Sequence, residues 1–227
     1  MIRAVLFDLD GTLADTAPDL AGALNILLAE QGAPLIEFEK ARPLTSMGAR
    51  GMIKAGLNIE PIHPEFETLR ERYLAIYRNN ICVHTKLFDG MPELLHALEQ
   101  QGIVWGIVTN KHERFTAPLL QALQLDTRAG CVVCGDTTAH SKPHPAPLLH
   151  AAKLIGVSPQ ECLYVGDDVR DIQAARAAHM PVIAAGYGYL GEASDPVLWQ
   201  ADGIIFSPGE VLNYLTPTAS IPGATRS

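Results

Sequence analysis

The sequence predicts an α/β fold: a doubly wound, mainly parallel Rossmann-like sheet with an all-helical cap inserted after its first strand. Three observations favour it. Short, nearly continuous apolar runs alternate with segments of helical periodicity, as repeated strand–helix crossovers do. A helical stretch of about seventy residues separates the first apolar run from the next. Polar clusters follow several of the runs, where the carboxyl ends of parallel strands meet.

Strands are predicted where short apolar runs would be covered on both faces of a sheet. These runs are residues 3–7, 103–108, 131–134, 162–165 and 182–185, with 203–206 as a sixth candidate. Between them, residues 91–101 and 145–155 carry apolar side chains at helical spacing and end before Gly102 and Gly156. The order predicts crossover helices on both faces of a parallel sheet.

The stretch between Ala14 and Phe88 is far too long for a simple strand–helix connection. It contains two apolar stripes at helical spacing, which are Leu20, Leu24, Leu27 and Leu28, and then Phe66, Leu69, Tyr73, Ile76 and Tyr77. We therefore predict a helical cap over residues 15–87 and a Rossmann-like core over residues 1–14 and 88–215. Residues 216–227 are rich in Pro, Gly, Ser and Thr and are expected to form a flexible tail.

Composition limits the classes of partner. The net charge of −8 disfavours a nucleic-acid or anionic-membrane surface, because both attract basic proteins. The apolar run at the N-terminus is short and is interrupted by Asp8, which excludes it as a signal peptide or a membrane span. We expect a cytoplasmic protein that acts on a small molecule as a monomer or homodimer, without nucleic-acid or membrane partners.

The four cysteines are too few for a disulfide scaffold. Cys131 and Cys134 have a spacing that metal or redox pairs also use, but no second cysteine pair completes a zinc site. Two small side chains on a buried strand are favoured over a metal or redox pair by roughly five to one.

Four polar clusters are expected to meet beyond the sheet. They are Asp8-Leu9-Asp10-Gly11-Thr12, Thr109-Asn110-Lys111, Ser141-Lys142-Pro143 and Gly166-Asp167-Asp168-Val169-Arg170-Asp171. Carboxylate oxygens suit a hard divalent cation, whereas ammonium, hydroxyl and amide donors suit a phosphate. The competing interpretation of the first cluster is a calcium loop, but an EF-hand needs Gly at its sixth position, where this sequence has Leu13.

The order of these motifs resembles the haloacid dehalogenase-like superfamily, in its phosphoglycolate phosphatase-like branch with a helical cap. The resemblance spans residue 3 to about residue 206 and implies a magnesium-dependent phosphatase. Carried over residue by residue, it makes Asp8 the nucleophile and Asp10 the general acid and base. It also implies that Thr109 and Lys142 hold the phosphoryl group and that Asp167 is a metal ligand. From the chemistry of the side chains we add Asn110 to the catalytic set, as a donor to the phosphoryl oxygens, and expect Mg²⁺ to bind Asp8, the backbone carbonyl of Asp10, and Asp167.

Charge supports this assignment. A phosphate dianion must approach several carboxylates, and each close like-charge pair costs on the order of 4 kcal/mol at about 4 Å in a medium of effective dielectric constant ~20. Mg²⁺ and Lys142 would offset that repulsion. Asp168 and Asp171 remain alternatives for a supporting role, either orienting a metal-bound water or steadying Lys142.

The substrate is expected to be chosen by the cap. Candidate substrate-binding residues are Arg50, Ser46 and Gly48 in the cap and Lys111 beside the Thr-Asn pair. Two substrates are considered, 2-phosphoglycolate and N-acetylmuramate 6-phosphate, which both pair a phosphate with a carboxylate. Details of the cap resemble the sub-branch that acts on N-acetylmuramate 6-phosphate in cell-wall recycling, and Tyr187 and Tyr189 are expected to line the roomier pocket that a sugar needs.

Two other functions compete with hydrolysis. A sugar-phosphate mutase of the same superfamily would return the phosphoryl group to its substrate and would need a bisphosphate activator. A phospho-accepting receiver module also uses an Asp, a Thr and a Lys on a doubly wound sheet. The inserted cap and the second Asp at position 10 disfavour the receiver, because Asp10 would hasten loss of the phosphoryl group.

Overall fold

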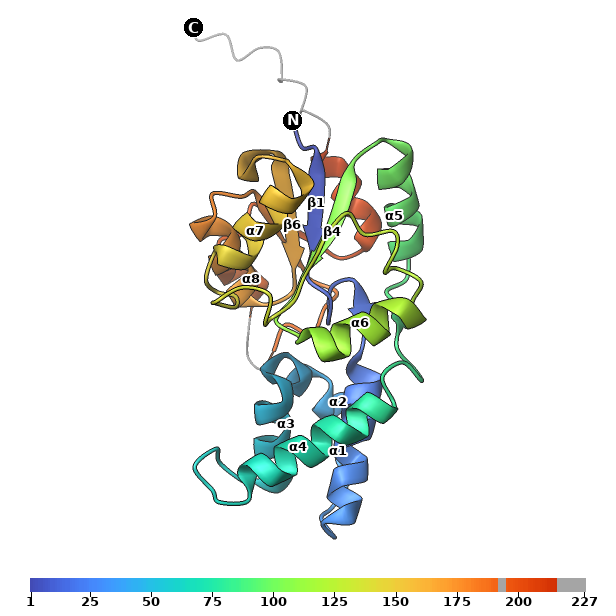
Figure 1. Cartoon of the computed structure of the whole chain (residues 1–227), viewed down its shortest axis with the longest axis vertical. Coiled ribbons are helices and arrows are strands. Elements are labelled where there is room, and N and C mark those ends of the chain that lie inside the picture. The colour runs from blue at the N-terminus through green and yellow to red at the C-terminus, as the bar shows by residue number, and fades with distance from the viewer. Residues whose placement is uncertain (192–194, 216–227) are drawn as a thin grey trace, which may run out of the picture.

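A computed structural model describes residues 1–191 and 195–215 of the chain. Its main sheet has six parallel strands in the order β5-β4-β1-β6-β7-β8 (Figure 1). The strands are β1 (Ala4–Phe7), β4 (Val104–Val108), β5 (Val132–Val133), β6 (Cys162–Gly166), β7 (Val182–Ala185) and β8 (Gly203–Ile205). The predicted doubly wound parallel sheet is confirmed, with each strand inside or within a residue of its apolar run.

Strand β1 lies at the centre of the sheet because its side chains are apolar on both faces. Val5 and Phe7 belong to the core on one face, and Ala4 and Leu6 to the core on the other. Successive side chains of a strand point to opposite faces, so a continuous apolar run is needed to bury all four. Strands β4 and β6 flank β1 in register, with Ala4 opposite both Val104 and Cys162.

Helices cover both faces of the sheet. Apolar side chains of α5 (Met91–Gln100) and α6 (Glu113–Ala122) pack in one core, and those of α7 (Ala146–Ile155) and α8 (Val169–Ala177) pack in the other. Cys131 and Cys134 flank the short β5 as buried free thiols, and burial raises the pKa of Cys131 to about 12.

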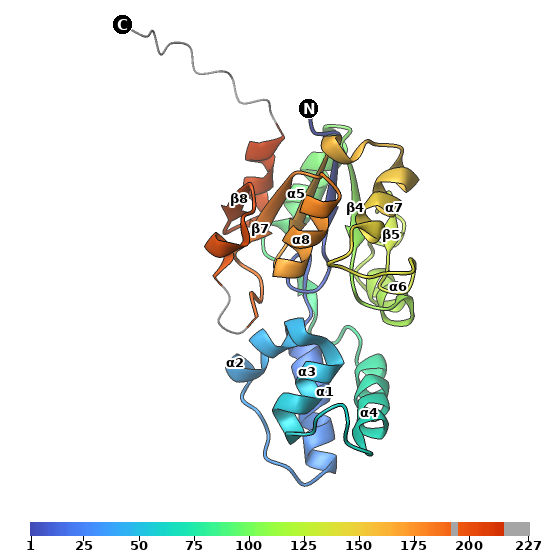
Figure 2. The same ribbon diagram turned by 90° about the vertical axis from the view of Figure 1, so that its left-hand side faces the viewer.

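Four helices follow β1 and pack on one another below the sheet (Figure 2). They are α1 (Ala17–Glu30), α2 (Phe38–Ala41), α3 (Gly48–Leu57) and α4 (Phe66–Asn79), and a 3-10 turn, Pro43–Met47, precedes α3. Both predicted apolar stripes contribute to a separate core, which includes Leu24, Leu27 and Tyr73. Phe115 of α6 also belongs to this core, so the helical unit is packed against the sheet unit through that ring.

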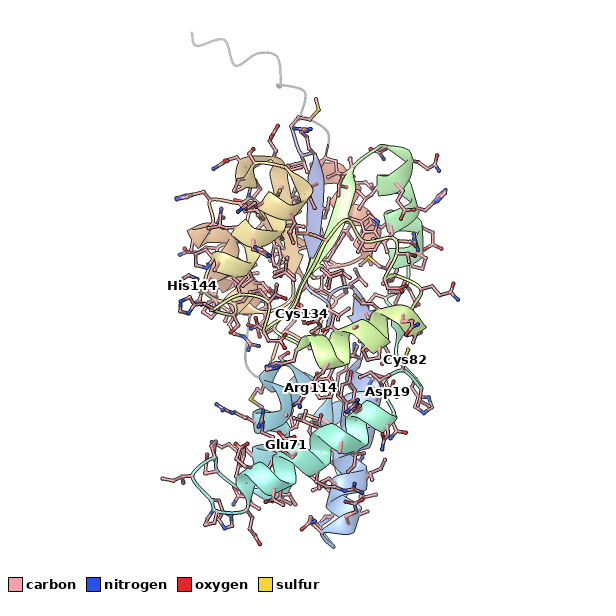
Figure 3. The ribbon with its side chains drawn as sticks, viewed as in Figure 1. Asp19, Glu71, Cys82, Arg114, Cys134 and His144 are labelled. Atoms are coloured by element: carbon pink, nitrogen blue, oxygen red, sulfur yellow. The ribbon has the colours of Figure 1, made fainter. Side chains whose placement is uncertain are left out.

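Two chain crossings join the helical unit to the sheet unit. Strands β2 (Ala14–Asp15) and β3 (Lys86–Leu87) pair antiparallel there. Buried Asp19 of α1 fixes the second crossing, because its carboxylate accepts hydrogen bonds from the backbone N–H groups of residues 83–85 and from the Thr85 hydroxyl. Figure 3 shows Asp19 next to this crossing. In the folded chain, the carboxyl ends of the central strands face the helical unit formed by α1 to α4 (Figure 1).

The predicted tail at residues 216–227 lies outside the described residues. Within the described part of the chain, none of the helices has the length and apolarity needed to cross a bilayer.

Candidate active site

The four predicted clusters meet at the carboxyl edge of the sheet. Asp8 follows β1, Thr109 follows β4, Asp167 lies directly beyond β6, and Lys142 lies on the loop that leaves β5. The strand order explains why Asp8, Thr109 and Asp167 lie together, because β4 and β6 are the two neighbours of β1. The loop after β5 reaches across to them, since the ammonium of Lys142 lies 2.9 Å from Asp8 Oδ1.

Lys142 is held by a buried set of oxygen atoms. Its Nζ donates to the Val108 carbonyl at 2.9 Å and to the Tyr164 hydroxyl at 2.8 Å, and it lies 2.6 Å from Asp171 Oδ1. Burial by itself would lower the pKa of Lys142, but the carboxylates of Asp171 and Asp8 outweigh burial and raise it. The side chain is 2% exposed and stays a fixed positive charge beside the predicted nucleophile.

Three carboxylates crowd this position. Asp8, Asp167 and Asp171 each offer an oxygen within 4.8 Å of the others. Burial is the main cause that raises the pKa of Asp8 to about 7, and the negative charges of Asp171 and Asp10 add to it while Lys142 opposes it. Burial, followed by Asp8 and Asp171, also raises the pKa of Asp167 well above its ordinary value. Lys142 supplies one positive charge against three carboxylates, so the site suits a further cation.

Asp167 is oriented for binding by two fixed donors. The Thr12 hydroxyl donates to its Oδ1 at 2.7 Å, and the backbone N–H of Tyr189 donates to its Oδ2 at 2.8 Å. A Cβ on Gly11 or Gly188 would collide with the Asp167 side chain, so both loops need glycine to approach it. The chemistry of the Asp8 and Asp167 oxygens therefore fits a hard divalent cation.

Asp10 occupies a different environment from Asp8. Its Oδ1 accepts hydrogen bonds from the Thr16 hydroxyl at 2.5 Å and from Lys111 Nζ at 2.8 Å. Lys111 also lies over the Tyr77 ring, 4.7 Å from the ring centroid. Burial opposes the charge on Lys111, but Asp10 and Tyr77 raise its pKa. Lys111, predicted to bind a substrate carboxylate, pairs with Asp10 in the structure and also lines the cavity, so its contact with a substrate stays a prediction.

Thr109 and Asn110 have unequal roles in the structure. Thr109 lines the cavity, and its hydroxyl accepts from the Lys111 backbone N–H. The Asn110 side chain forms two reciprocal 2.9 Å hydrogen bonds with the backbone of Lys142. Its amide therefore joins two loops of the site through one of its two N–H donors, and its use for a phosphoryl oxygen stays a prediction.

Asp168 and Asp171, left as alternatives by the sequence, point in different directions. Asp171 contacts Lys142, so it steadies that ammonium. Asp168 caps α8 and forms two hydrogen bonds with the Arg170 guanidinium, at 2.7 and 2.8 Å. Arg170 in turn donates to the Ser46 carbonyl of the helical unit at 2.6 Å. Asp168 therefore acts at the contact between the two units.

A cavity of about 500 Å³ lies between the sheet edge and the helices. Asp8, Asp10, Thr109 and Asp167 line it from one side, and the predicted cap residues Ser46, Gly48 and Arg50 line it from the other. Lys54, another basic residue of α3, does not line the cavity and pairs with Glu60. Tyr187 and Tyr189 are not among the lining residues. Their hydroxyls bond to the loop after β1, at the Thr12 carbonyl and at the backbone N–H groups of Thr16 and Ala17.

Several residues have roles at the site that the sequence analysis did not assign to them. Thr12 and Thr16 orient Asp167 and Asp10, and Tyr189 supports the loop after β1. Thr12 was detectable from its place inside the first motif. Tyr189 lies about 170 residues from its partners and gave no such signal.

Comparison with known proteins agrees with this geometry. A family model described as haloacid dehalogenase-like hydrolase matches residues 5–185. The chain is 41% identical over 214 residues to an N-acetylmuramic acid 6-phosphate phosphatase of Pseudomonas aeruginosa, covering 94% of this chain and 95% of that protein. It is 46% identical over 209 residues to a phosphoglycolate phosphatase of Xanthomonas campestris, covering 92% and 94%.

A solved structure with the same fold comes from Haemophilus somnus and is described as a predicted phosphoglycolate phosphatase. It superposes with a TM-score of 0.84 at 27% sequence identity and covers 95% of this chain and 98% of that one.

Proposed function

This chain belongs to the haloacid dehalogenase-like hydrolase family, and we propose that it is a Mg²⁺-dependent phosphatase of a small phosphorylated metabolite. The observation that carries the proposal is the meeting of Asp8, Asp10, Asp167 and Lys142 at one end of the cavity. The phosphatase names of relatives that are 41% and 46% identical over most of the chain support it.

The reaction follows from the positions of the two aspartates. An Asp8 carboxylate oxygen attacks phosphorus, the bond to the leaving oxygen breaks, and Asp10 protonates that oxygen. Water then attacks the phosphorus of the aspartyl phosphate while Asp10 accepts its proton, which releases phosphate and restores Asp8. Thr16 and Lys111 hold the Asp10 carboxylate during both steps, and Lys142 neutralises charge beside Asp8.

The metal would be held by Asp8, Asp167 and the backbone carbonyl of Asp10. When bound, Mg²⁺ offsets the negative charge of the phosphate and the carboxylates. Burial raises the pKa of both Asp8 and Asp167, and the charges of neighbouring carboxylates add to it, which supports a cation at this position.

Metal removal gives the first prediction. EDTA is expected to stop phosphate release, and added Mg²⁺ is expected to restore it, whereas Ca²⁺ is not. Calcium favours higher coordination numbers and bidentate carboxylates, which would immobilise Asp8. Steady-state phosphate release with each metal measures the effect, and full activity with Ca²⁺ or in EDTA would contradict the proposed site.

For the substrate we propose N-acetylmuramate 6-phosphate over 2-phosphoglycolate. The cavity of about 500 Å³ lies within the ~300–1,000 Å³ range of small-molecule sites and suits a sugar ring better than a two-carbon acid. Relatives carrying each activity in their names match the chain to a similar extent. The cavity size is therefore the observation that supports this choice.

A substrate panel tests this choice and gives the second prediction. The ratio kcat/KM is expected to be ~10-fold or more higher for N-acetylmuramate 6-phosphate than for 2-phosphoglycolate, because a site built for one hydrogen-bonding pattern rejects an analogue that lacks it. An equal or higher value for phosphoglycolate would reverse the assignment. Phosphate release without a bisphosphate activator distinguishes the phosphatase from a mutase in the same assay.

A further inference from the structure

Most of the positive charges that line the cavity are already neutralised by neighbouring carboxylates. Five arginine and lysine side chains line it, and three of them have acidic partners, in the pairs Lys111–Asp10, Arg170–Asp168 and Arg70–Glu67. In the part of the chain that the structure describes, Arg50 and Arg114 have no carboxylate partner. These two guanidinium groups remain available to an anionic ligand.

Two buried hydroxyl groups on the cavity wall are also without hydrogen bonds. The Oγ of Ser46 and the Oη of Tyr77 make no hydrogen bond of ordinary geometry among the described residues, and the Lys111 ammonium lies close to Tyr77. Tyr77 is 1% exposed. A buried hydroxyl without a partner is unfavourable, and a ligand that supplies the missing hydrogen bond removes that penalty.

Arg114 and Tyr77 both contact the aromatic ring of Phe115. The Arg114 guanidinium carbon lies 4.8 Å from the centroid of the Phe115 ring, and the Tyr77 ring centroid lies 5.8 Å from the same ring. Phe115 is buried in the core of the helical unit although it belongs to α6. Figure 3 shows Arg114 where α6 meets the helices below the sheet.

This wall of the cavity lies beside the proposed general acid. Tyr77 contacts Lys111, and Lys111 pairs with Asp10. Because Asp10 protonates the leaving oxygen, the alcohol part of the substrate must lie next to it. The body of the substrate therefore extends toward Tyr77 and Arg114.

We propose that Arg114 and Tyr77 are specificity-determining residues for the alcohol part of the substrate, a conclusion that rests on the proposed phosphatase function. Arg114 binds a carboxylate on the leaving alcohol, and the Tyr77 hydroxyl binds a neighbouring neutral polar group such as a ring oxygen, hydroxyl or amide. The substrate class is thus an acidic sugar phosphate.

Two esters that differ by one carboxylate test Arg114. N-acetylglucosamine 6-phosphate has the N-acetylhexosamine phosphate of N-acetylmuramate 6-phosphate without the lactyl acid. Arg114→Gln is expected to lower kcat/KM for the muramate ester by ~10- to 100-fold, mainly through KM, and to change the glucosamine ester by less than about twofold. Arg114→Lys is expected to recover part of the loss.

The same panel tests Tyr77. Tyr77→Phe removes only the hydroxyl and keeps the ring beside Lys111 and Phe115. It is expected to lower kcat/KM for both sugar esters by ~5- to 20-fold and to lower it clearly less for p-nitrophenyl phosphate, because that ester has no sugar to bind. An equal loss on all three esters would mean that Tyr77 supports the fold or Asp10 and not specificity.

Arg78→Gln is the matched control. Arg78 is exposed, directly follows Tyr77 in α4 and does not line the cavity, so it reports the general loss of one positive charge. Equal kinetics of Arg114→Gln and Arg78→Gln on the muramate ester would overturn the proposal. If the wild-type protein hydrolyses none of the esters, the proposed function itself is wrong. If it hydrolyses the muramate and glucosamine esters with equal kcat/KM, the lactyl carboxylate is not recognised, and only the inference about Arg114 and Tyr77 is wrong.

Discussion

Replacing Asp8 with Asn is expected to lower kcat for phosphate release by on the order of 10⁴-fold or more, the size of loss that follows removal of a catalytic nucleophile. The amide keeps the shape of the side chain but cannot form the aspartyl phosphate. It also removes one of the three crowded carboxylates. Single-turnover and steady-state phosphate release in Mg²⁺ measure the effect.

Folding of the Asp8→Asn protein separates lost chemistry from lost structure. Its melting temperature without metal is expected to equal or exceed that of the wild type, since burial and neighbouring charges disfavour the ionised Asp8. Asp89→Asn is the matched control, because the Asp89 side chain is almost fully exposed and does not belong to the cluster of Asp8, Asp167 and Asp171. Retained activity in Asp8→Asn, or loss in Asp89→Asn, would contradict the assignment of the nucleophile.

Replacing Lys142 with Met is expected to abolish activity and to lower the free energy of unfolding by about 3–5 kcal/mol, the usual cost of removing one partner of a buried ion pair. The substitution keeps the length of the side chain but leaves buried Asp171 without its cation. Urea unfolding in EDTA measures the stability, because bound metal would otherwise compensate by mass action.

A second substitution isolates the charge effect. Lys142→Met combined with Asp171→Asn removes the stranded carboxylate and is expected to recover roughly 1–2 kcal/mol of the free energy of unfolding, a coupling typical of residues in direct contact. Activity should stay absent in the double variant. A double variant that is no more stable than the sum of the single changes would show that the two residues are not coupled.

Much of the architecture was predictable because it depends on local apolar patterns. A strand covered on both faces needs an unbroken apolar run, as in residues 4–7, and an inserted helical unit needs stripes at helical spacing, as in α1 and α4. The nature of the site was predictable for a related reason. Parallel strands deliver their ends to one edge, so Asp8, Thr109 and Asp167 had to meet there once the sheet was inferred.

Partner choice inside the site was decided by tertiary structure. Lys111 was free to face a substrate in the sequence, but the approach of β4 to β1 places its ammonium 2.8 Å from Asp10. Likewise, Asp168 and Asp171 are equivalent acids in a motif. The turn of α8 directs one to Arg170 and the other to Lys142.

Tertiary structure also decided which residues form the part of the cavity proposed to bind the alcohol of the substrate. Arg114 and Tyr77 are 37 positions apart in the sequence, and neither belongs to a motif. Both contact the ring of Phe115, which packs into the core of the helical unit. By itself the sequence determined which kinds of groups gather at the sheet edge, since residue type and strand position are local properties. Which of those groups remain unpaired depends on contacts between distant segments, and only the folded chain decides that.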